Sequence, residues 1–125
     1  MLSPFPDAEA VVIDIISPVA PGYTELPDGF IPDAIRVTRT GGADDGITDS
    51  ALVEVTSFGS SRARAWQMDG EVRQHILAAG GSAFNGVLVD QSRTAIPSQQ
   101  LPDPRDDVRV VTSSYRLAFR RQLHS

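Results

Sequence analysis

The stretch Val108–Arg120 (VRVVTSSYRLAFR) decides the fold, because it is the longest run of alternating β-branched and aromatic residues in the sequence. In a strand, successive side chains point to opposite faces. One face of this segment carries its large apolar residues, Val111, Tyr115, Leu117 and Phe119. The other face is partly apolar as well, with Val108, Val110 and Ala118. We therefore predict a strand that packs on helices with one face and, with the other, meets either the core or a neighbouring molecule.

The predicted strand is long for a chain of this size. The sequence has 125 residues, and a compact fold of that length has a diameter of about 36 Å. A strand over Val108–Arg120, at ~3.3 Å per residue, spans about 40 Å. We expect it to cross the whole of a single domain, residues 1–125, with one end able to project.

Shorter runs of the same kind predict the rest of the sheet. They are rich in β-branched residues or alternate between apolar and polar side chains. The segments are Ala34–Thr40, Ala51–Phe58, Gly86–Asp90 and Thr94–Pro97. Between the first two, Gly41–Ser50 (GGADDGITDS) is predicted to be a flexible acidic loop. Before the last strand, the prolines of Leu101–Asp107 predict a turn.

Two segments have the three-and-four spacing of an amphipathic helix. The first carries its apolar residues at Ala8, Val11, Val12, Ile15 and Ile16. It is ended by Pro18, because the residue before a proline avoids the α region. The second begins at Ser60 or Ser61, either of which can cap it, and runs to about Ala79. The order helix–strand–strand–helix–strands predicts an α+β domain, with a mostly antiparallel sheet and two helices packed on it.

Composition narrows the class of protein. Cysteine is absent, which excludes disulfides, thiolate metal sites and thiol nucleophiles. Acidic residues outnumber basic ones 16 to 11, and the net charge of −5 argues against general affinity for nucleic acid. No segment resembles a secretory signal or reaches the ~20 apolar residues that cross a bilayer. We expect no membrane association, and a protein kept in the cytoplasm or in a particle assembled there.

A search for catalytic or metal-binding motifs identifies none. His75 lies in a polar stretch of the second predicted helix, and His124 lies beside the C-terminal residue. Neither has the converging partners that a metal site or a nucleophile–base pair needs. The acidic loop fails the EF-hand pattern, since placing Gly46 sixth puts Gly41 first and Leu52 twelfth. We predict a non-enzymatic protein without a cofactor or a metal.

Taken in order, the segments resemble the tail terminator (minor tail, tail-completion) proteins of bacteriophages with long non-contractile tails, especially those infecting actinobacteria. The resemblance is in the succession of elements rather than in a catalytic motif. The segments that carry it are Phe5–Ala10, Ile35–Gly42, Val53–Gly59, Ser61–Trp66 and Ser114–Phe119. A basic complement made only of arginine, typical of GC-rich genomes, agrees with such a source.

The resemblance implies a structural virion protein that forms a six-membered ring on the finished tail tube. Such a ring ends tube polymerisation and joins the tube to the head connector, at the head-proximal end of the tail. Its partners would be other copies of itself, the major tail tube protein and the connector, with DNA passing through the lumen unbound. Two alternatives remain: another head–tail connector or completion protein, or a small non-enzymatic ligand-binding α+β module. An enzyme with an unfamiliar carboxylate site is a more distant third.

Within that implied ring, two groups of residues are candidates for contact. Asp44, Asp45 and Asp49 of the acidic loop are candidates to face the lumen or the tube, where negative charge repels DNA phosphates. An ordinary solvated hairpin connection is the alternative for this loop. The candidates for the subunit interface come from the second helix and the last strand. They are Arg62, Trp66, Arg116, Phe119 and Arg120.

Overall fold

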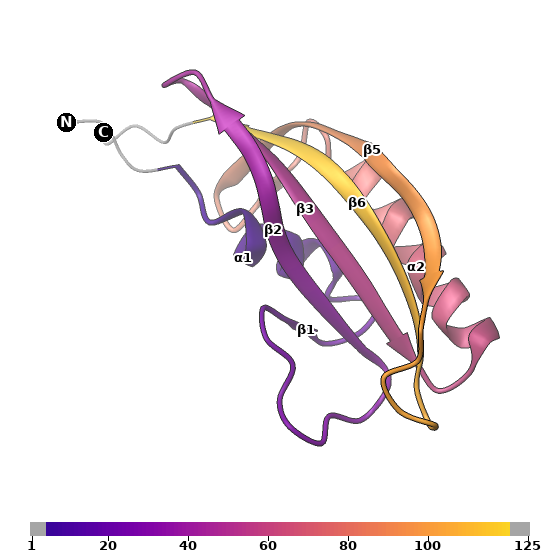
Figure 1. The fold of residues 1–125 in the computed structure, drawn as a ribbon. Helices are drawn as coiled ribbons and strands as arrows, with labels where there is room; N and C mark the ends of the chain where they lie inside the picture. Colours follow the sequence, from indigo (N-terminus) through magenta and orange to yellow (C-terminus); the bar gives the residue numbers. More distant parts are fainter. Residues whose placement is uncertain (1–4, 121–125) are drawn as a thin grey trace.

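Two helices, α1 (Ala8–Ile16) and α2 (Arg62–Ala78), pack on one face of a curled six-stranded sheet (Figure 1). In chain order the strands are β1 (Gly22–Tyr23), β2 (Ala34–Asp44), β3 (Thr48–Gly59), β4 (Ala83–Phe84), β5 (Val87–Leu101) and β6 (Arg109–Arg120). Across the sheet their order is β1-β2-β3-β6-β5-β4. This computed structural model describes residues 5–120. None of the helices within that range is both long enough and apolar enough to span a bilayer.

The elements with the clearest periodicity form as predicted. α1 follows Asp7, whose carboxylate accepts hydrogen bonds from the backbone of the first turn. α2 follows Ser61, whose hydroxyl accepts the Arg64 N–H at 3.1 Å. β6 pairs with β3 from Arg109 to Arg120, so the longest predicted strand does run the length of the sheet. Periodicity was informative here because each of these elements buries one continuous face.

The prediction of a mostly antiparallel sheet is wrong, although the α+β class holds. The sheet is a mixed, curled half-barrel, and residues 5–120 are 47% strand and 22% helix. Its parallel member is β1, which follows the Pro18–Pro21 connector and runs alongside the start of β2. The Ile35 N–H donates to the carbonyl of Pro21 at 3.0 Å and extends that pairing. The sequence could not predict the parallel direction of β1, because a strand of two residues is too short to show a periodic pattern.

The predicted flexible loop over 41–50 is also wrong, because most of it is paired strand. β2 and β3 stay in register up to Asp44 and Asp49, with one bulge between Arg39 and Gly41. The turn itself is short. Asp45 Oδ1 accepts the N–H groups of Ile47 at 2.9 Å and Thr48 at 2.7 Å, and Gly46 adopts φ +86°. Side-chain acceptors and a left-handed glycine close a tight hairpin here.

The two short strands predicted over 86–97 are one bulged strand, β5, which continues to Leu101. Its register against β6 shifts three times, between Val89 and Gln91, Thr94 and Ile96, and Ile96 and Gln99. Each shift breaks the alternation of apolar and polar residues, so the sequence shows two fragments where the backbone is continuous. Pro97 is accommodated because β5 has no strand partner on its outer side there, among the described residues.

The core lies between the helices and one face of the sheet. The side chains that the central strands contribute alternate in sequence and are fully buried: Ala51, Val53, Val55, Tyr115, Leu117 and Phe119. A smaller apolar cluster forms on the opposite face, at the end where β5 turns into β6. There Phe58 and Val110 are covered by Leu26 and Phe30 of the long connection between β1 and β2. Neither α1 nor α2 covers the rest of that opposite face, and we call it the open face.

Candidate functional site

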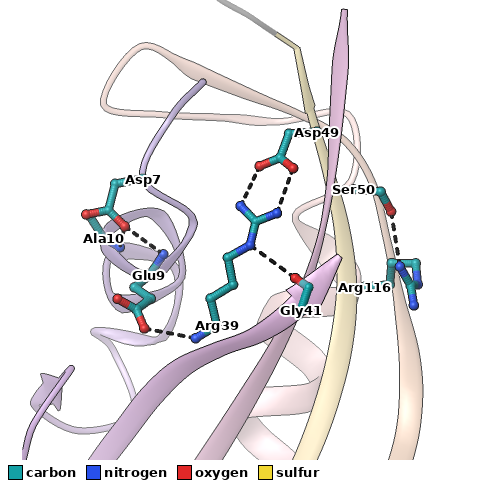
Figure 2. Close-up of polar contacts among 8 residues, drawn as sticks. All are labelled: Asp7, Glu9, Ala10, Arg39, Gly41, Asp49, Ser50 and Arg116. Carbon is teal, nitrogen blue, oxygen red and sulfur yellow. Dashed lines mark hydrogen bonds and ion pairs between the residues drawn. The ribbon is translucent and has the colours of Figure 1, made fainter. Parts of the chain in front are cut away.

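The β2–β3 hairpin is tied to α1 and to itself by one arginine (Figure 2). Arg39 donates through both terminal nitrogens to the Asp49 carboxylate, at 2.6 and 2.7 Å, and through Nε to the Gly41 carbonyl at 3.1 Å. Its backbone N–H donates to Glu9 of α1 at 2.9 Å. The hydrogen bond to Asp49 raises the pKa of Arg39, against an opposing effect of burial. The fork geometry fixes the upper part of the hairpin over the helix.

The three candidate acidic residues therefore fall into two groups. The Asp49 side chain is 4% exposed and its charge is balanced by Arg39, so it does not face a lumen or a tube as predicted. Asp44 and Asp45 lie exposed at the hairpin turn, next to Ile47, which is 70% exposed. Hydrogen bonds from the backbone of Thr48 and Ile47 lower the pKa of Asp45. We call residues 44–47, with their two charged carboxylates and exposed isoleucine, the tip.

Of the predicted interface residues, Arg62 and Trp66 lie together on α2. Both donate to the side-chain carbonyl of Gln100 on β5, at 3.1 and 3.3 Å. The Arg62 guanidinium also lies 6.0 Å from the centre of the Trp66 ring. The group joins the start of α2 to the far part of β5, and it leaves Arg62 exposed and Trp66 half-buried.

The other three predicted interface residues are on β6 and do not join that group. Arg116 and Arg120 point to the open face, opposite to the helices. Arg120 is exposed and pairs with Asp90 at 2.8 Å. Phe119 points to the helices and is fully buried, so it belongs to the core of its own chain and not to the molecular surface. Because successive side chains of a strand point to opposite faces, these three residues, although close in sequence, do not form one surface.

The open face contains a hollow of about 150 Å³ near the hairpin end of the sheet. Its lining comes from three strands and consists of Ser50, Gln91, Ser92, Arg93, Arg116 and Ala118. Arg93 stands directly opposite Arg116 in the β5–β6 register. The Arg116 guanidinium donates to the Ser50 hydroxyl at 3.4 Å (Figure 2), and neither arginine forms an ion pair within residues 5–120.

Arg93 was missed in the sequence analysis. A lone arginine between two predicted fragments of strand carries no signal of its own. Its place opposite Arg116 depends on the bulges of β5, which set the register and are invisible to a pattern of period two.

A buried polar network lies beneath α2 rather than at a surface site. Asp69 of α2 is 3% exposed, and the Ser113 hydroxyl donates to its Oδ1 at 2.8 Å. The Ser98 hydroxyl donates to Oδ2. The hydroxyl oxygens of Ser113 and Tyr115 also form a hydrogen bond, at 2.8 Å. Because Ser113 donates its single hydroxyl hydrogen to Asp69, the Tyr115 hydroxyl is the donor in this second bond. Burial raises the pKa of Tyr115 to about 12. This network fastens α2 to the sheet.

The histidine of α2 gathers no partners for chemistry among residues 5–120, because His75 is exposed. His124 lies outside the described residues. Within residues 5–120, no three His, Cys, Asp or Glu side chains are placed to hold a metal ion. Among the surface polar features of residues 5–120, three involve residues considered above: the hairpin tip, the Arg62–Trp66 group and the arginine-lined hollow.

The fold of this chain is similar to that of a chain in a solved particle structure. A chain from a solved structure described as "Virion of native gene transfer agent (GTA) particle" superposes with a TM-score of 0.55 at 12% identity. The match covers 90% of this chain and 87% of that one. At this identity the similarity concerns the fold alone. No curated protein matches the sequence.

The sequence itself settles the family. The family model described as "Phage tail termination protein" matches residues 4–125, nearly the whole chain. The chain therefore belongs to the phage tail termination protein family, and it is a structural protein of the phage tail. The resemblance inferred from the order of its segments is confirmed.

Proposed function

We propose that this protein caps the phage tail tube as a six-membered ring, ends tube polymerisation and forms the surface that joins the tube to the head connector. The observation that carries the proposal is the family match over residues 4–125. The similarity in fold to a chain of a gene transfer agent virion supports a place within a particle of this general kind. In this role the protein is not an enzyme and needs no cofactor.

The sheet offers the two different surfaces that a closed ring requires. A ring is built from heterologous contacts, in which one patch of each subunit meets a different patch of the next. β2 is paired on its outer side only near Ile35 and Arg36, and β5 only near its start. Within the described residues, both outer strands thus keep free lengths on opposite sides of the molecule. Exposed strand edges are ready surfaces for association.

Assembly would take place in the host cytoplasm, and the ring would lie at the head-proximal end of the tail. Its partners are the major tail tube protein on one side and the connector on the other. DNA passes through the ring without specific binding, which suits a chain of net charge −5 because like charges repel. Each contact between subunits, if of standard size, buries about 800 Å² per partner.

Light scattering across a concentration series tests the ring, and a tube-polymerisation assay tests the cap. We expect a species of six subunits, formed either alone or on added tail tubes, and tubes that stop growing once the protein is present. A chain that stays monomeric or dimeric at every concentration, and that tail tubes do not recruit, would contradict the proposal. That outcome would favour a small ligand-binding module instead.

A further inference from the structure

The arginine-lined hollow on the open face has more positive charge than residues 5–120 balance with ion pairs. Arg93 and Arg116 stand directly opposite each other on neighbouring strands, an arrangement in which like charges destabilise a sheet. Two carboxylates lie nearby on the same face. Asp90 is bound to Arg120 at 2.8 Å, while Glu54 lies two residues along β3 from the position opposite Arg116 and forms no ion pair with it. An anionic group placed in the hollow would relieve this repulsion.

The tip has the complementary chemistry. Its carboxylates, Asp44 and Asp45, accept hydrogen bonds from backbone N–H groups of the turn and form no ion pair within the described part of the chain. Ile47 beside them is 70% exposed, and Ile96, on the strand that carries Arg93 but outside the lining of the hollow, is 48% exposed. The unpaired charges of the tip and of the hollow are opposite in sign.

We propose that the tip of one subunit binds in the arginine-lined hollow of the next, so that Asp44 and Asp45 of one copy pair with Arg93 and Arg116 of its neighbour. The inference rests on the proposed ring and assigns one of its contacts. In this arrangement the tip lies at the subunit interface and does not face the lumen or the tube. Because tip and hollow are different patches, the contact is heterologous, as closure of a ring requires.

Strand order makes the contact geometrically consistent. β2 lies toward one side of the sheet and β5 toward the other, and β2, β3, β6 and β5 alternate in direction. A neighbour whose β2 follows this β5 continues the alternation. The tip follows β2 at the level of Asp49 of β3, and the hollow lies toward the same end of the sheet, level with Ser50 to Leu52. β4 covers the outer side of β5 only at Val87 and Leu88. Arg93 lies past that pairing, on the free part of β5, where a neighbour's tip can reach it.

Charge reversal tests the contact in a way that misfolding does not imitate. The first variant, Arg93→Glu/Arg116→Glu, makes the hollow negative. The second, Asp44→Arg/Asp45→Asn, makes the tip positive, and its asparagine keeps an acceptor oxygen for the turn. In either variant alone, tip and hollow carry charges of the same sign, so we expect the apparent dissociation constant for assembly to rise about tenfold or more. In an equal mixture, each variant's tip meets a complementary hollow on the other. The mixture should assemble as an alternating ring, which an even number of subunits allows to close.

Controls separate this contact from other effects. Arg73→Glu repeats one charge reversal on an exposed part of α2, and we expect it to assemble like the wild type. Arg93→Glu alone changes only an exposed side chain, and we expect a weaker form of the same defect without loss of folding. Assembly of the wild type should weaken with added salt, since the contact is electrostatic.

Four outcomes would overturn the inference. Unchanged assembly of both variants would refute the contact while leaving the ring intact. Failure of the mixture to assemble, with each variant folded by circular dichroism, would show that tip and hollow do not meet. Binding of labelled duplex DNA that Arg93→Glu/Arg116→Glu abolishes would make the hollow a phosphate contact. A wild-type chain that never forms a ring, alone or on tail tubes, contradicts the proposed function and this contact together.

Discussion

The two faces of the sheet come from the same strands, but one carries mainly apolar side chains and the other mainly polar ones. On β6, Leu117 and Phe119 are fully buried beneath the helices, whereas Arg116 and Arg120, which alternate with them, point to the open face. The helix-covered face holds the core that specifies the fold. The open face is mostly small and polar, with an apolar cluster only where Phe30 folds over Phe58. The covered face therefore supplies the stability of the fold, and the residues of the open face are free of that task.

Removing a large side chain from the covered face should have the largest effect on stability. Phe119→Ala should lower the free energy of unfolding by ~3–5 kcal/mol, because it leaves a cavity among Val89, Leu117 and their neighbours. Urea unfolding followed by circular dichroism measures it. The matched change on the open face, Arg116→Ala, should cost less than ~1 kcal/mol. Equal losses for the two variants would mean that the open face is as tightly packed as the core.

The buried network around Asp69 is a polar part of the covered face, and it should behave as part of the core. Asp69→Ala removes the acceptor shared by Ser98 and Ser113. Leaving those hydroxyls unsatisfied should cost ~2–3 kcal/mol of unfolding free energy. A double-mutant cycle with Ser113→Ala should give a coupling well above the error of the unfolding measurement. Additive losses would show that Asp69 does not fasten α2 through this network.

The covered face was predictable from the sequence to a much greater degree than the open face. The apolar residues of α1, α2 and β6 repeat at the period of their own backbone, so those elements appear in the sequence with nearly their observed bounds. The hairpin over 41–50 did not, because its paired residues are glycine, alanine and aspartate, which read as loop. Its strands form because Asp45 and Gly46 close the turn and Arg39 holds Asp49.

The candidate site was predictable only in part, for a related reason. The exposed carboxylates of Asp44 and Asp45 could be singled out because acidic residues cluster there in sequence. Arg116 could be singled out as a polar residue in an apolar strand, but Phe119 was wrongly grouped with it. The pairing of Arg93 with Arg116 depends on strand order and on three bulges in β5, and no local pattern encodes either.

The stability of the covered face should depend on pH through the side chain of Tyr115. Burial raises the pKa of Tyr115 from its ordinary value of 10 to about 12. The unfolded chain therefore loses the Tyr115 proton at lower pH than the folded chain does. The Tyr115 contribution to stability is complete below pH 10 and is lost as the pH rises toward about 12. Tyr115→Phe should flatten this part of the stability profile, measured by urea unfolding between pH 9 and 11.5 (roughly the span that the shift covers).

The smallest effect on stability should come from the open face at Arg93. Arg93→Ala removes an exposed side chain from a strand edge, so we expect the free energy of unfolding to change by less than ~0.5 kcal/mol. Its sign should be stabilising, because the change also removes a like charge opposite Arg116. Thermal unfolding at low salt measures this, and the gain should shrink when salt screens the pair. A residue that lowers the stability of its own chain and is needed for assembly would show that this face is shaped for a partner. A loss of more than ~1 kcal/mol would instead make Arg93 part of the fold.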